Sequence, residues 1–480
     1  MSIRHRIDEW FKGPDELDLT TGAIGKPLFF LSLPIVITNL LQTAYNLADT
    51  FWLGQYSTNA LAAITFAFPL VFLMFSLGMG VTVAGSVLVA QHIGADEEQQ
   101  AMYAASQTVS FAIVVATLLG IVGYMVVDEI LLIFGAEPDV LQLAVAYLQI
   151  IALGLPFMFG FFVFISLMRG YGNTVTPMFV MLFTVVVNIL LDPFLIFGWT
   201  IFPELGVVGA AVATVFARGM AFIVGLVILF RGHRGVEISI SDMEPDIDYA
   251  RKIIDIGLPA SIEMTGRSVS VNLMLIIVGL FSTPVVAGYG IGIRMFSVIF
   301  LPAIAVARGV ETMTGQNIGA NKPDRAAEAA RLAAIGMFGI LTLVGALVWI
   351  RPDPIANLFT DNPEVILVAR NFLRWVAPTF GFIGVMRAYT GSFRGAGKTL
   401  TSAVISITML GVIRLPVAWF TIGPLGSNGI WLSFAVSNVI GAILAYGWYQ
   451  RGTWREADVT GEPGVESIEG ADVGSPETDD

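Results

Sequence analysis

Long apolar stretches separated by short polar segments follow one another along almost the whole chain. A helix needs about 20 residues to span the hydrocarbon core of a bilayer, and these stretches reach that length. Many are longer, which indicates helices that tilt or extend beyond the hydrocarbon. The pattern predicts an all-α integral membrane protein with twelve transmembrane helices. They are expected near residues 27–53, 61–91, 102–127, 139–165, 176–199, 205–231, 252–280, 285–316, 326–350, 364–390, 400–422 and 427–450.

A thin polar edge interrupts the first apolar stretch. Asn39, Gln42, Asn46 and Asp49 recur at steps of three, four and three, so on a helix they fall within an arc of roughly 80°. An ionisable side chain in a membrane span costs about 2.5–3.5 kcal/mol, and therefore needs a partner, a water-filled cavity or a function. Contact between helices explains Asn39 best. Gln42 and Asn46 are equally compatible with such contacts and with a substrate cavity beside Asp49.

A second carboxylate lies deep in the fifth predicted helix. Asp192 belongs to the segment VVVNILLDPF, and Asn188 precedes it by one turn on the same face. Pro193 follows, which removes a backbone donor and frees a carbonyl near the carboxylate. Carboxylate, amide and hydroxyl oxygens form a hard donor set suited to Na⁺ or to a shared proton. Arg218 in the sixth helix is the nearest basic side chain expected in this half.

Composition supports the membrane assignment. Only 13% of the residues are charged and 56% are hydrophobic, whereas soluble globular domains carry about 25% charged residues. The chain has no cysteine, which excludes disulfide frameworks and thiolate metal sites. Residues 1–20 have no apolar core, so we expect no cleavable signal peptide. Residues 455–480 hold nine acidic side chains against Arg455, and we predict that this tail is disordered.

Basic residues are distributed unevenly between the two sides of the predicted membrane protein. Sixteen of them fall in the termini and loops of one side, whereas Arg351 alone falls on the other. The side richer in Lys and Arg faces the cytoplasm. We therefore expect a multi-pass protein of the plasma membrane with both termini in the cytoplasm.

The two halves of the chain repeat one another. QHIGADEEQQAMYAA at 91–105 matches QNIGANKPDRAAEAA at 316–330, and LMRGYGNTVTPM at 167–178 matches SFRGAGKTLTSA at 392–403, both at an offset of 225 residues. Six helices per copy is an even number, so both copies enter the membrane in the same sense. They are predicted to form two parallel-repeat bundles related by a pseudo-two-fold axis along the membrane normal, a geometry typical of alternating-access transporters.

The repeat also predicts the domain organisation. We expect a cytoplasmic N-terminal segment, an N-lobe of helices one to six, a cytoplasmic linker, a C-lobe of helices seven to twelve, and the acidic tail. These divisions fall at residues 1–26, 27–231, 232–251, 252–450 and 451–480.

The second half does not repeat the polar stripe or Asp192. No carboxylate stands near Leu415, the position equivalent to Asp192. The four stripe positions become Met264, Arg267, Val271 and Met274. Cation chemistry is therefore expected in the first half alone. The second half contains other charged side chains within its predicted helices, for which we expect a structural ion-pair network that would also disfavour a cationic cargo. They are Glu263, Arg267, Arg294, Arg308, Glu311, Arg374 and Arg387.

The motifs NLADTFWLG, NILLDP, the paired QxIGA segments and the RGxGxTxTPM-like loops resemble those of the multidrug and toxic compound extrusion (MATE) family. The resemblance covers residues 20–450. It implies two six-helix lobes around a V-shaped cavity, and export of amphipathic, mostly cationic compounds against entry of Na⁺ or H⁺. It also implies an N-lobe cation site at Asp49, Asn188 and Asp192, with Thr214 as an added oxygen.

One feature of some family members is missing. They carry acids on helices seven and ten as a C-lobe cation site, whereas this chain has Arg267 at that depth of helix seven and Glu263 one turn earlier. Helix ten offers arginines, and its only acid is Glu364 at the outer start. We therefore expect no cation site in the C-lobe.

Together these features predict a secondary active multidrug efflux transporter driven by Na⁺ or H⁺. Cation binding at Asp49 and Asp192 would remove the charge that holds a cationic substrate, while the first helix bends near Pro34 and Gln42 and Asn46 line the cavity. The alternative is a flippase for a lipid-linked saccharide, which the C-lobe arginines favour and the two aspartates disfavour.

Other functions are disfavoured. An intramembrane enzyme would need a catalytic constellation, but His5, His92 and His233 are the only histidines and fall at inner helix ends or loops. The glycine-rich loops lack the GxxxxGK[ST] pattern of an ATP site. We expect no cofactor beyond the coupling ion, no nucleic-acid partner, and a monomer in the lipid bilayer.

Overall fold

The computed structural model describes residues 18–133, 138–457 and 459–460. The first basic residues, Arg4, Arg6 and Lys12, and most of the acidic tail lie outside these ranges. Within the described ranges, all the regular secondary structure is helical. The predicted all-α fold class is confirmed.

The first half of the chain forms six long helices, each apolar enough to cross a membrane. They are α2 (Gly25–Tyr56), α3 (Thr58–Gly94), α4 (Glu98–Ile133), α5 (Pro138–Tyr171), α6 (Val175–Phe197) and α7 (Val207–Arg231). α5 is the central helix of this bundle and packs against α3, α4 and α7. α2 packs against α6, so the helix that carries the polar stripe lies beside the helix that carries Asp192.

The second half repeats this bundle with more interruptions. It consists of α8 (Ile247–Val278), α9 (Thr283–Gly319), α10 (Pro323–Ile350), the short α11 (Pro352–Asn357), α12 (Pro363–Val376), α13 (Phe380–Gly395), α14 (Thr399–Ile407), α15 (Leu415–Leu425) and α16 (Asn428–Tyr449). Eleven helical segments of the described residues are each long and apolar enough to span a membrane, and one of them comprises α14 and α15 together. The broken α12–α13 segment provides the twelfth, so the predicted number of spans is confirmed.

The tenth and eleventh spans are broken, although the sequence predicted continuous helices. A 3₁₀ turn at Ala377–Thr379 separates α12 from α13, because Pro378 has no N–H to donate to the preceding turn. A π-helical segment, η4 (Thr408–Arg414), separates α14 from α15 just before Pro416. Single π-helical turns are rare and are often found at functional sites.

The linker between the halves is packed onto the first bundle. A 3₁₀ turn, η2 (Ile240–Met243), lies against α4, where Gln107 Nε2 donates hydrogen bonds to the carbonyls of Asp242 and Glu244, both at 2.7 Å. Asp246 caps the N-terminus of α8 through the backbone N–H groups of residues 248 and 249. The helix therefore begins at Ile247, before the predicted start at 252.

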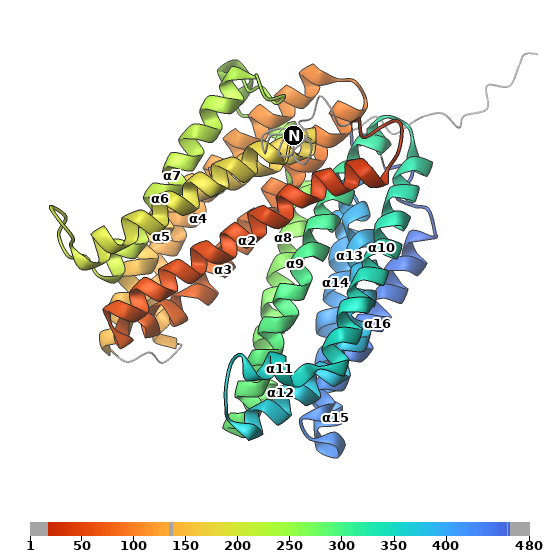
Figure 1. The fold of residues 1–480 in the computed structure, drawn as a ribbon. Coiled ribbons are helices and arrows are strands. Elements are labelled where there is room, and N and C mark those ends of the chain that lie inside the picture. The colour runs from red at the N-terminus through yellow and green to blue at the C-terminus, as the bar shows by residue number, and fades with distance from the viewer. Residues whose placement is uncertain (1–17, 134–137, 458, 461–480) are drawn as a thin grey trace, which may run out of the picture.

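The two bundles form the arms of a V (Figure 1). They meet at the upper end of the view and splay apart at the lower end. Glycines permit the contact where the arms meet. A Cβ atom on Gly94 would lie 1.9 Å from the carbonyl oxygen of Gln316, and one on Gly319 would lie 1.9 Å from that of Gln91. Gly94 and Gly319 are separated by the repeat offset, so the contact follows the predicted pseudo-two-fold axis.

Side chains of the repeated QxIGA segments reinforce the same junction. Gln91 Nε2 donates to the carbonyl of Gly395 at 3.0 Å, and Gln316 Nε2 donates to that of Gly170 at 3.1 Å. Each glutamine thus reaches from one half to a glycine of the other half. The duplicated motif closes the end of the molecule that the charge distribution predicts to be cytoplasmic.

Candidate functional site

The two predicted carboxylates meet inside the first bundle. Asp49 of α2 is 4% exposed, and Asp192 and Asn188 of α6 are fully buried. Thr214 of α7 is also buried and donates a hydrogen bond from Oγ1 to Asp49 Oδ2 at 3.4 Å. Three helices therefore bring the four residues together, as the sequence and the resemblance had suggested for a cation site.

Several oxygens at this place have no hydrogen-bond partner. Asn188 Nδ2 donates to Asp192 Oδ1 at 3.2 Å, and the side chains of Asp49 and Asp192 lie within interaction distance of each other. Among the described residues, Asp49 Oδ1, Asp192 Oδ2 and Asn188 Oδ1 are buried and unpartnered. Leaving a buried acceptor unsatisfied costs about 1–3 kcal/mol, and more for a charged group. Three such acceptors in one place favour a bound cation or proton.

A proline interrupts the backbone hydrogen bonds of α6 next to Asp192. Pro193 lies within the helix and directly after Asp192. Because proline has no N–H, the carbonyl of Ile189 receives no hydrogen bond from position 193. This carbonyl belongs to the residue after Asn188, and carbonyl oxygens are ligands that hard cations such as Na⁺ prefer.

Arg218 is closer to the site than the sequence indicated. Its side chain is buried at 2% exposure, Nη2 donates to Gln42 Oε1 at 2.6 Å, and the guanidinium lies 4.6 Å from the centre of the Tyr45 ring. Gln42 Nε2 in turn donates to Asn46 Oδ1 at 3.0 Å. Arg218 interacts electrostatically with Asp49 without forming an ion pair within 4.0 Å. Hydrogen bonds thus link Gln42 and Asn46 of the stripe to Arg218, whereas Asn39 Nδ2 is buried without a hydrogen-bond partner.

Sequence reasoning overlooked the pairing of Tyr45 with Arg218. A signal for it was present, since Tyr45 lies four residues before Asp49 and Arg218 lies four residues after Thr214. On two neighbouring helices, those spacings place the Tyr–Arg pair one turn away from the Asp–Thr pair. Gln42 is half-buried and hydrogen-bonded to Arg218, and Asn46 is exposed.

Pro34 lies where α2 passes from one half of the molecule to the other. The helix is continuous through Pro34, and Thr38 Oγ1 donates to the carbonyl of Pro34 at 2.8 Å. Just before it, Ser32 packs on α9 of the second half, where a Cβ on Gly309 would lie 2.6 Å from Ser32 Oγ. Beyond Pro34 the helix runs along α6. A bend at Pro34 would therefore move the stripe relative to the second half.

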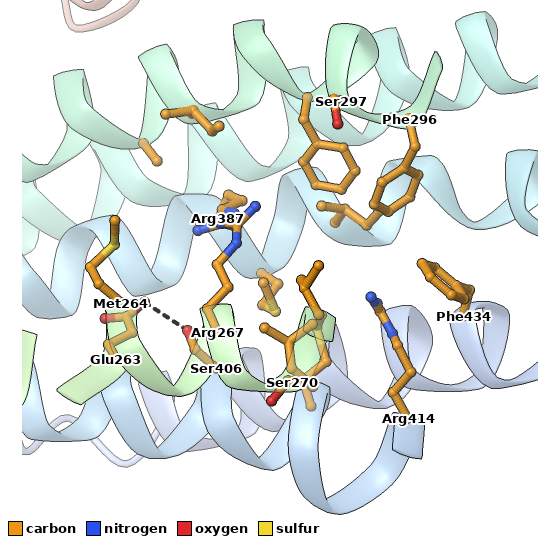
Figure 2. A pocket seen from close by; sticks show the side chains of 18 of the residues that line it. Glu263, Met264, Arg267, Ser270, Phe296, Ser297, Arg387, Ser406, Arg414 and Phe434 are labelled. Atoms are coloured by element: carbon orange, nitrogen blue, oxygen red, sulfur yellow. Dashed lines mark hydrogen bonds between the residues drawn. The ribbon is translucent and has the colours of Figure 1, made fainter. Parts of the chain in front are cut away.

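Inside the second bundle is a cavity of about 310 Å³ bordered mainly by α8, α9, α13, η4 and α16, which we call the arginine cavity. Figure 2 shows its wall, with Arg267 reaching across from α8 toward Arg387 of α13, and Arg414 beside Phe434. Its lining contains five arginines and one acidic residue. They are Arg267, Arg308, Arg387, Arg394, Arg414 and Glu263.

The predicted ion-pair network exists, with different members from those expected. Glu311 accepts from Arg308 at 2.8 Å and from Arg394 at 3.1 Å, and lies 3.9 Å from Arg169 of the first half. Arg394 also contacts Glu263 at 3.4 Å. Arg169 and Arg394 are separated by the repeat offset of 225 residues, so the network joins equivalent arginines of the two halves.

Four members of the expected network are not part of it, namely Arg267, Arg294, Arg374 and Arg387. Arg267 makes no ion pair with Glu263, although the two are four residues apart on α8, because Glu263 accepts hydrogen bonds from Ser402 at 2.9 Å and Ser406 at 2.8 Å and faces Arg394. Arg294 and Arg374 are exposed rather than buried, since long basic side chains can place their charge outside the core while their stems pack on it.

Glu263 is fully occupied by partners within the protein. Both of its carboxylate oxygens accept hydrogen bonds, Oε1 from Ser406 and Arg394 and Oε2 from Ser402. A cation would have to displace a guanidinium to bind there.

Comparison with known proteins identifies the family. The MatE family model matches residues 34–194 and 259–420, once in each half. The chain is 29% identical over 442 residues to the probable multidrug resistance protein YpnP of Bacillus subtilis (strain 168), covering 91% of this chain and 97% of that protein. It is 26% identical over 437 residues to an FAD transporter of Shewanella oneidensis, with coverage of 91% and 97%.

Solved structures show the same fold. A MATE crystal structure in the bent conformation superposes with a TM-score of 0.84 at 24% identity, over 92% of this chain and 98% of that chain. A MOP superfamily transporter from Pyrococcus furiosus gives a TM-score of 0.82 at 23% identity, with the same coverage. The chain belongs to the MatE family, the multidrug and toxic compound extrusion transporters.

Proposed function

We propose that this protein is a secondary multidrug efflux transporter that exports amphipathic, cationic compounds by antiport with Na⁺ or H⁺. The observation that carries the proposal is the group of buried, unpartnered oxygens of Asp49, Asn188 and Asp192. Buried charges in a membrane protein are rare and mark ion or substrate pathways. Relatives named as multidrug resistance proteins support efflux as the activity.

Competition for charge provides the coupling. Two carboxylates at this short separation cannot both stay charged without compensation in a poorly solvated place. Arg218 supplies one positive charge nearby, and Na⁺, a proton or a cationic cargo supplies the next. Entry of the coupling ion removes the attraction for the cargo, and release of the ion to the cytoplasm restores it. Thr214 completes the oxygen set by orienting Asp49.

Bending of α2 at Pro34 is the proposed movement that links ion binding to cargo release. The segment before Pro34 is held against α9, whereas the segment after it carries Asp49 along α6. A bend would change the position of the stripe without breaking the contact of α2 with the second half.

We also propose the orientation and state of the molecule. The arms of the V meet at the end that the basic residues assign to the cytoplasm and splay apart at the other end (Figure 1). This arrangement is outward-open in the plasma membrane, with both termini in the cytoplasm and the monomer as the transporting unit.

A flippase for a lipid-linked saccharide is the second candidate. The arginine cavity favours it, because a pyrophosphate headgroup needs several cationic partners. These arginines lie within one half, however, and the other half presents Asp49 and Asp192. A flippase would not require Asp49 to be charged, which separates the two candidates.

The test is transport of a fluorescent cation, tetramethylrhodamine ethyl ester, by proteoliposomes under a Na⁺ gradient or a pH gradient. We expect one gradient to drive transport in wild type, and Asp49→Asn to abolish it. The matched control is Asp128→Asn, since Asp128 is an exposed carboxylate on α4. Normal transport by Asp49→Asn, or no cation transport by wild type under either gradient, would contradict the proposal and favour the flippase.

A further inference from the structure

The arginine cavity has the size and wall of a ligand site. Its volume is about 310 Å³, and small-molecule pockets commonly measure about 300–1,000 Å³. Aromatic side chains, among them Phe296 and Phe434, form apolar parts of the wall, and a few polar groups converge between them (Figure 2). An apolar lining with a few fixed polar groups is the usual composition of a small-molecule site.

Among the residues that the structure describes, carboxylate partners are found for two of its arginines. Arg394 binds Glu263 and Glu311, and Arg308 binds Glu311. These contacts use both glutamates of the surrounding network. The remaining arginines of the wall form no ion pair with either glutamate, and Glu263 acts on Arg267 and Arg387 only through its charge at longer range.

Arg267 and Arg387 are the clearest unpaired charges. Neither makes a hydrogen bond or an ion pair with any of the described residues, and Arg387 Nε is a buried donor without a partner. The two guanidiniums repel each other across the cavity. Both line the same cavity, Arg267 from α8 and Arg387 from α13, with their labels next to each other in Figure 2.

Arg414 adds a third guanidinium, with neutral partners only. Its Nε donates to Ser437 Oγ at 2.8 Å, its Nη2 donates to Asn438 Oδ1 at 2.9 Å, and it lies 4.1 Å from the centre of the Phe434 ring. These contacts fix its orientation without neutralising its charge. Arg414 is the last residue of the π-helical segment η4, the kind of irregularity that often marks a functional site.

A cluster of uncompensated charges in a largely apolar wall is unfavourable unless a ligand or water compensates it. Guanidinium groups match carboxylate and phosphate geometry and form two parallel hydrogen bonds with them. We propose that the arginine cavity binds a carboxylate or phosphate group of an amphipathic organic anion, held by Arg267, Arg387 and Arg414 and packed on Phe296 and Phe434.

An anion site in the second half bears on the cargo of the transporter. If the proposed transport function holds, the bound anion is cargo, and the protein accepts anionic or zwitterionic compounds in the second half in addition to cations in the first. The binding itself does not depend on coupling at Asp49, so binding and transport test the two proposals separately.

Binding of fluorescein, an anionic dye, to the full-length protein in detergent tests the site through fluorescence anisotropy. We expect wild type to bind it and inorganic pyrophosphate to displace it. Arg267→Gln and Arg387→Gln should each weaken binding at least about tenfold, because each removes a charge-assisted hydrogen bond. Arg267→Lys, which keeps the charge, should weaken it less. Asp49→Asn should leave it unchanged even though transport is lost.

Two comparisons make the result specific. Arg351→Gln is the matched control, because Arg351 is an exposed arginine outside the cavity. The cationic dye tetramethylrhodamine ethyl ester shares the ring system of fluorescein, and its binding should not respond to Arg267→Gln. Failure of wild type to bind fluorescein, or equal affinity in wild type and both glutamine variants, would overturn the proposal. If the glutamine variants do not elute as a single species, Arg267→Lys and displacement by pyrophosphate decide the outcome.

The same assay in nanodiscs distinguishes a soluble anion from a lipid headgroup. Displacement of fluorescein by pyrophosphate in discs of neutral lipid indicates a soluble anion. Displacement only by added phosphatidylglycerol indicates a lipid headgroup at the same arginines. Displacement by neither anion would contradict an anion site.

Discussion

Adding one methyl group at Gly94 tests whether direct backbone contact holds the two halves together at the proposed cytoplasmic end. A Cβ at this position would lie 1.9 Å from the carbonyl oxygen of Gln316. Since ordinary contacts between heavy atoms begin near about 3.5 Å, the helices α3 and α9 would have to separate by about 1.6 Å. The atom that is struck belongs to the backbone of a helix, so it cannot move away by a side-chain rotation.

The magnitude follows from that overlap. Overpacking of a close contact costs about 1–3 kcal/mol. The added methyl group of Gly94→Ala clashes only where the halves touch. It therefore raises the free energy of the state with a closed junction and leaves that of states with separated halves unchanged. The population of the separated states should therefore rise by a factor of about 5–150.

The absence of cysteine from the chain makes labelling the appropriate assay. Thr312 is 1% exposed, and its Oγ1 donates to the carbonyl of Arg169 in the other half at 3.1 Å. In a Thr312→Cys background, Gly94→Ala should speed labelling by a membrane-impermeant maleimide in inside-out vesicles. Gly336→Ala is the control, because a Cβ there meets no atom within 4 Å. Unchanged labelling with Gly94→Ala, or an equal increase in the control, would refute the reasoning.

Three further predictions concern the ion site, the hinge and the linker. Thr214→Ala should weaken binding of the coupling ion about tenfold, since it removes one oxygen and the hydrogen bond to Asp49. Thr214→Ser keeps the hydroxyl and should retain the affinity. An equal loss of affinity in both variants would argue against Thr214 as an oxygen ligand. Pro34→Ala should preserve ion binding but reduce transport at least severalfold, so unchanged transport would exclude the hinge. The hydrogen bond from Tyr103 holds the pKa of Asp246 below its usual value. The bond therefore stabilises the fold at neutral pH, and this contribution is lost as pH falls through the lowered pKa. Thermal unfolding of Tyr103→Phe and wild type should differ at pH 7 and converge at acidic pH, and a difference independent of pH would contradict the assignment.

The sequence alone was sufficient to predict the positions of the helices and the residues on the polar face of α2. Apolar length predicts a span in a bilayer, and a regular spacing predicts which residues share a helix face. The burial of Asp49 and Asp192 followed from those two rules. Neither rule indicates which helix will pack against that face, so the contact of Arg218 with Gln42 and Tyr45 was not predicted.

The interruptions and the ion pairs were harder to predict for a different reason. The π-helical segment Thr408–Arg414 retains the apolar composition of a normal span, so hydropathy does not distinguish it. Arg394 and Glu311 are 83 residues apart, and only the packed bundle brings them together. Glu263 and Arg267 are four residues apart, a spacing that favours a local pair on a helix, but Glu263 contacts Arg394 and two serines instead. A distant partner in the folded state thus prevailed over a near one in sequence.

The most direct test of the coupling claim uses proteoliposomes preloaded with tetramethylrhodamine ethyl ester and measures ion uptake into them. Uptake of Na⁺ is followed with radioactive Na⁺, and uptake of H⁺ is followed with a pH-sensitive dye. The account predicts that cargo leaving the vesicles stimulates uptake of one of these ions in wild type and in Asp128→Asn. It predicts no stimulation in Asp49→Asn or Asp192→Asn. Stimulated ion uptake of equal size in both of those variants and in wild type would show that the buried carboxylates do not couple ion entry to cargo exit.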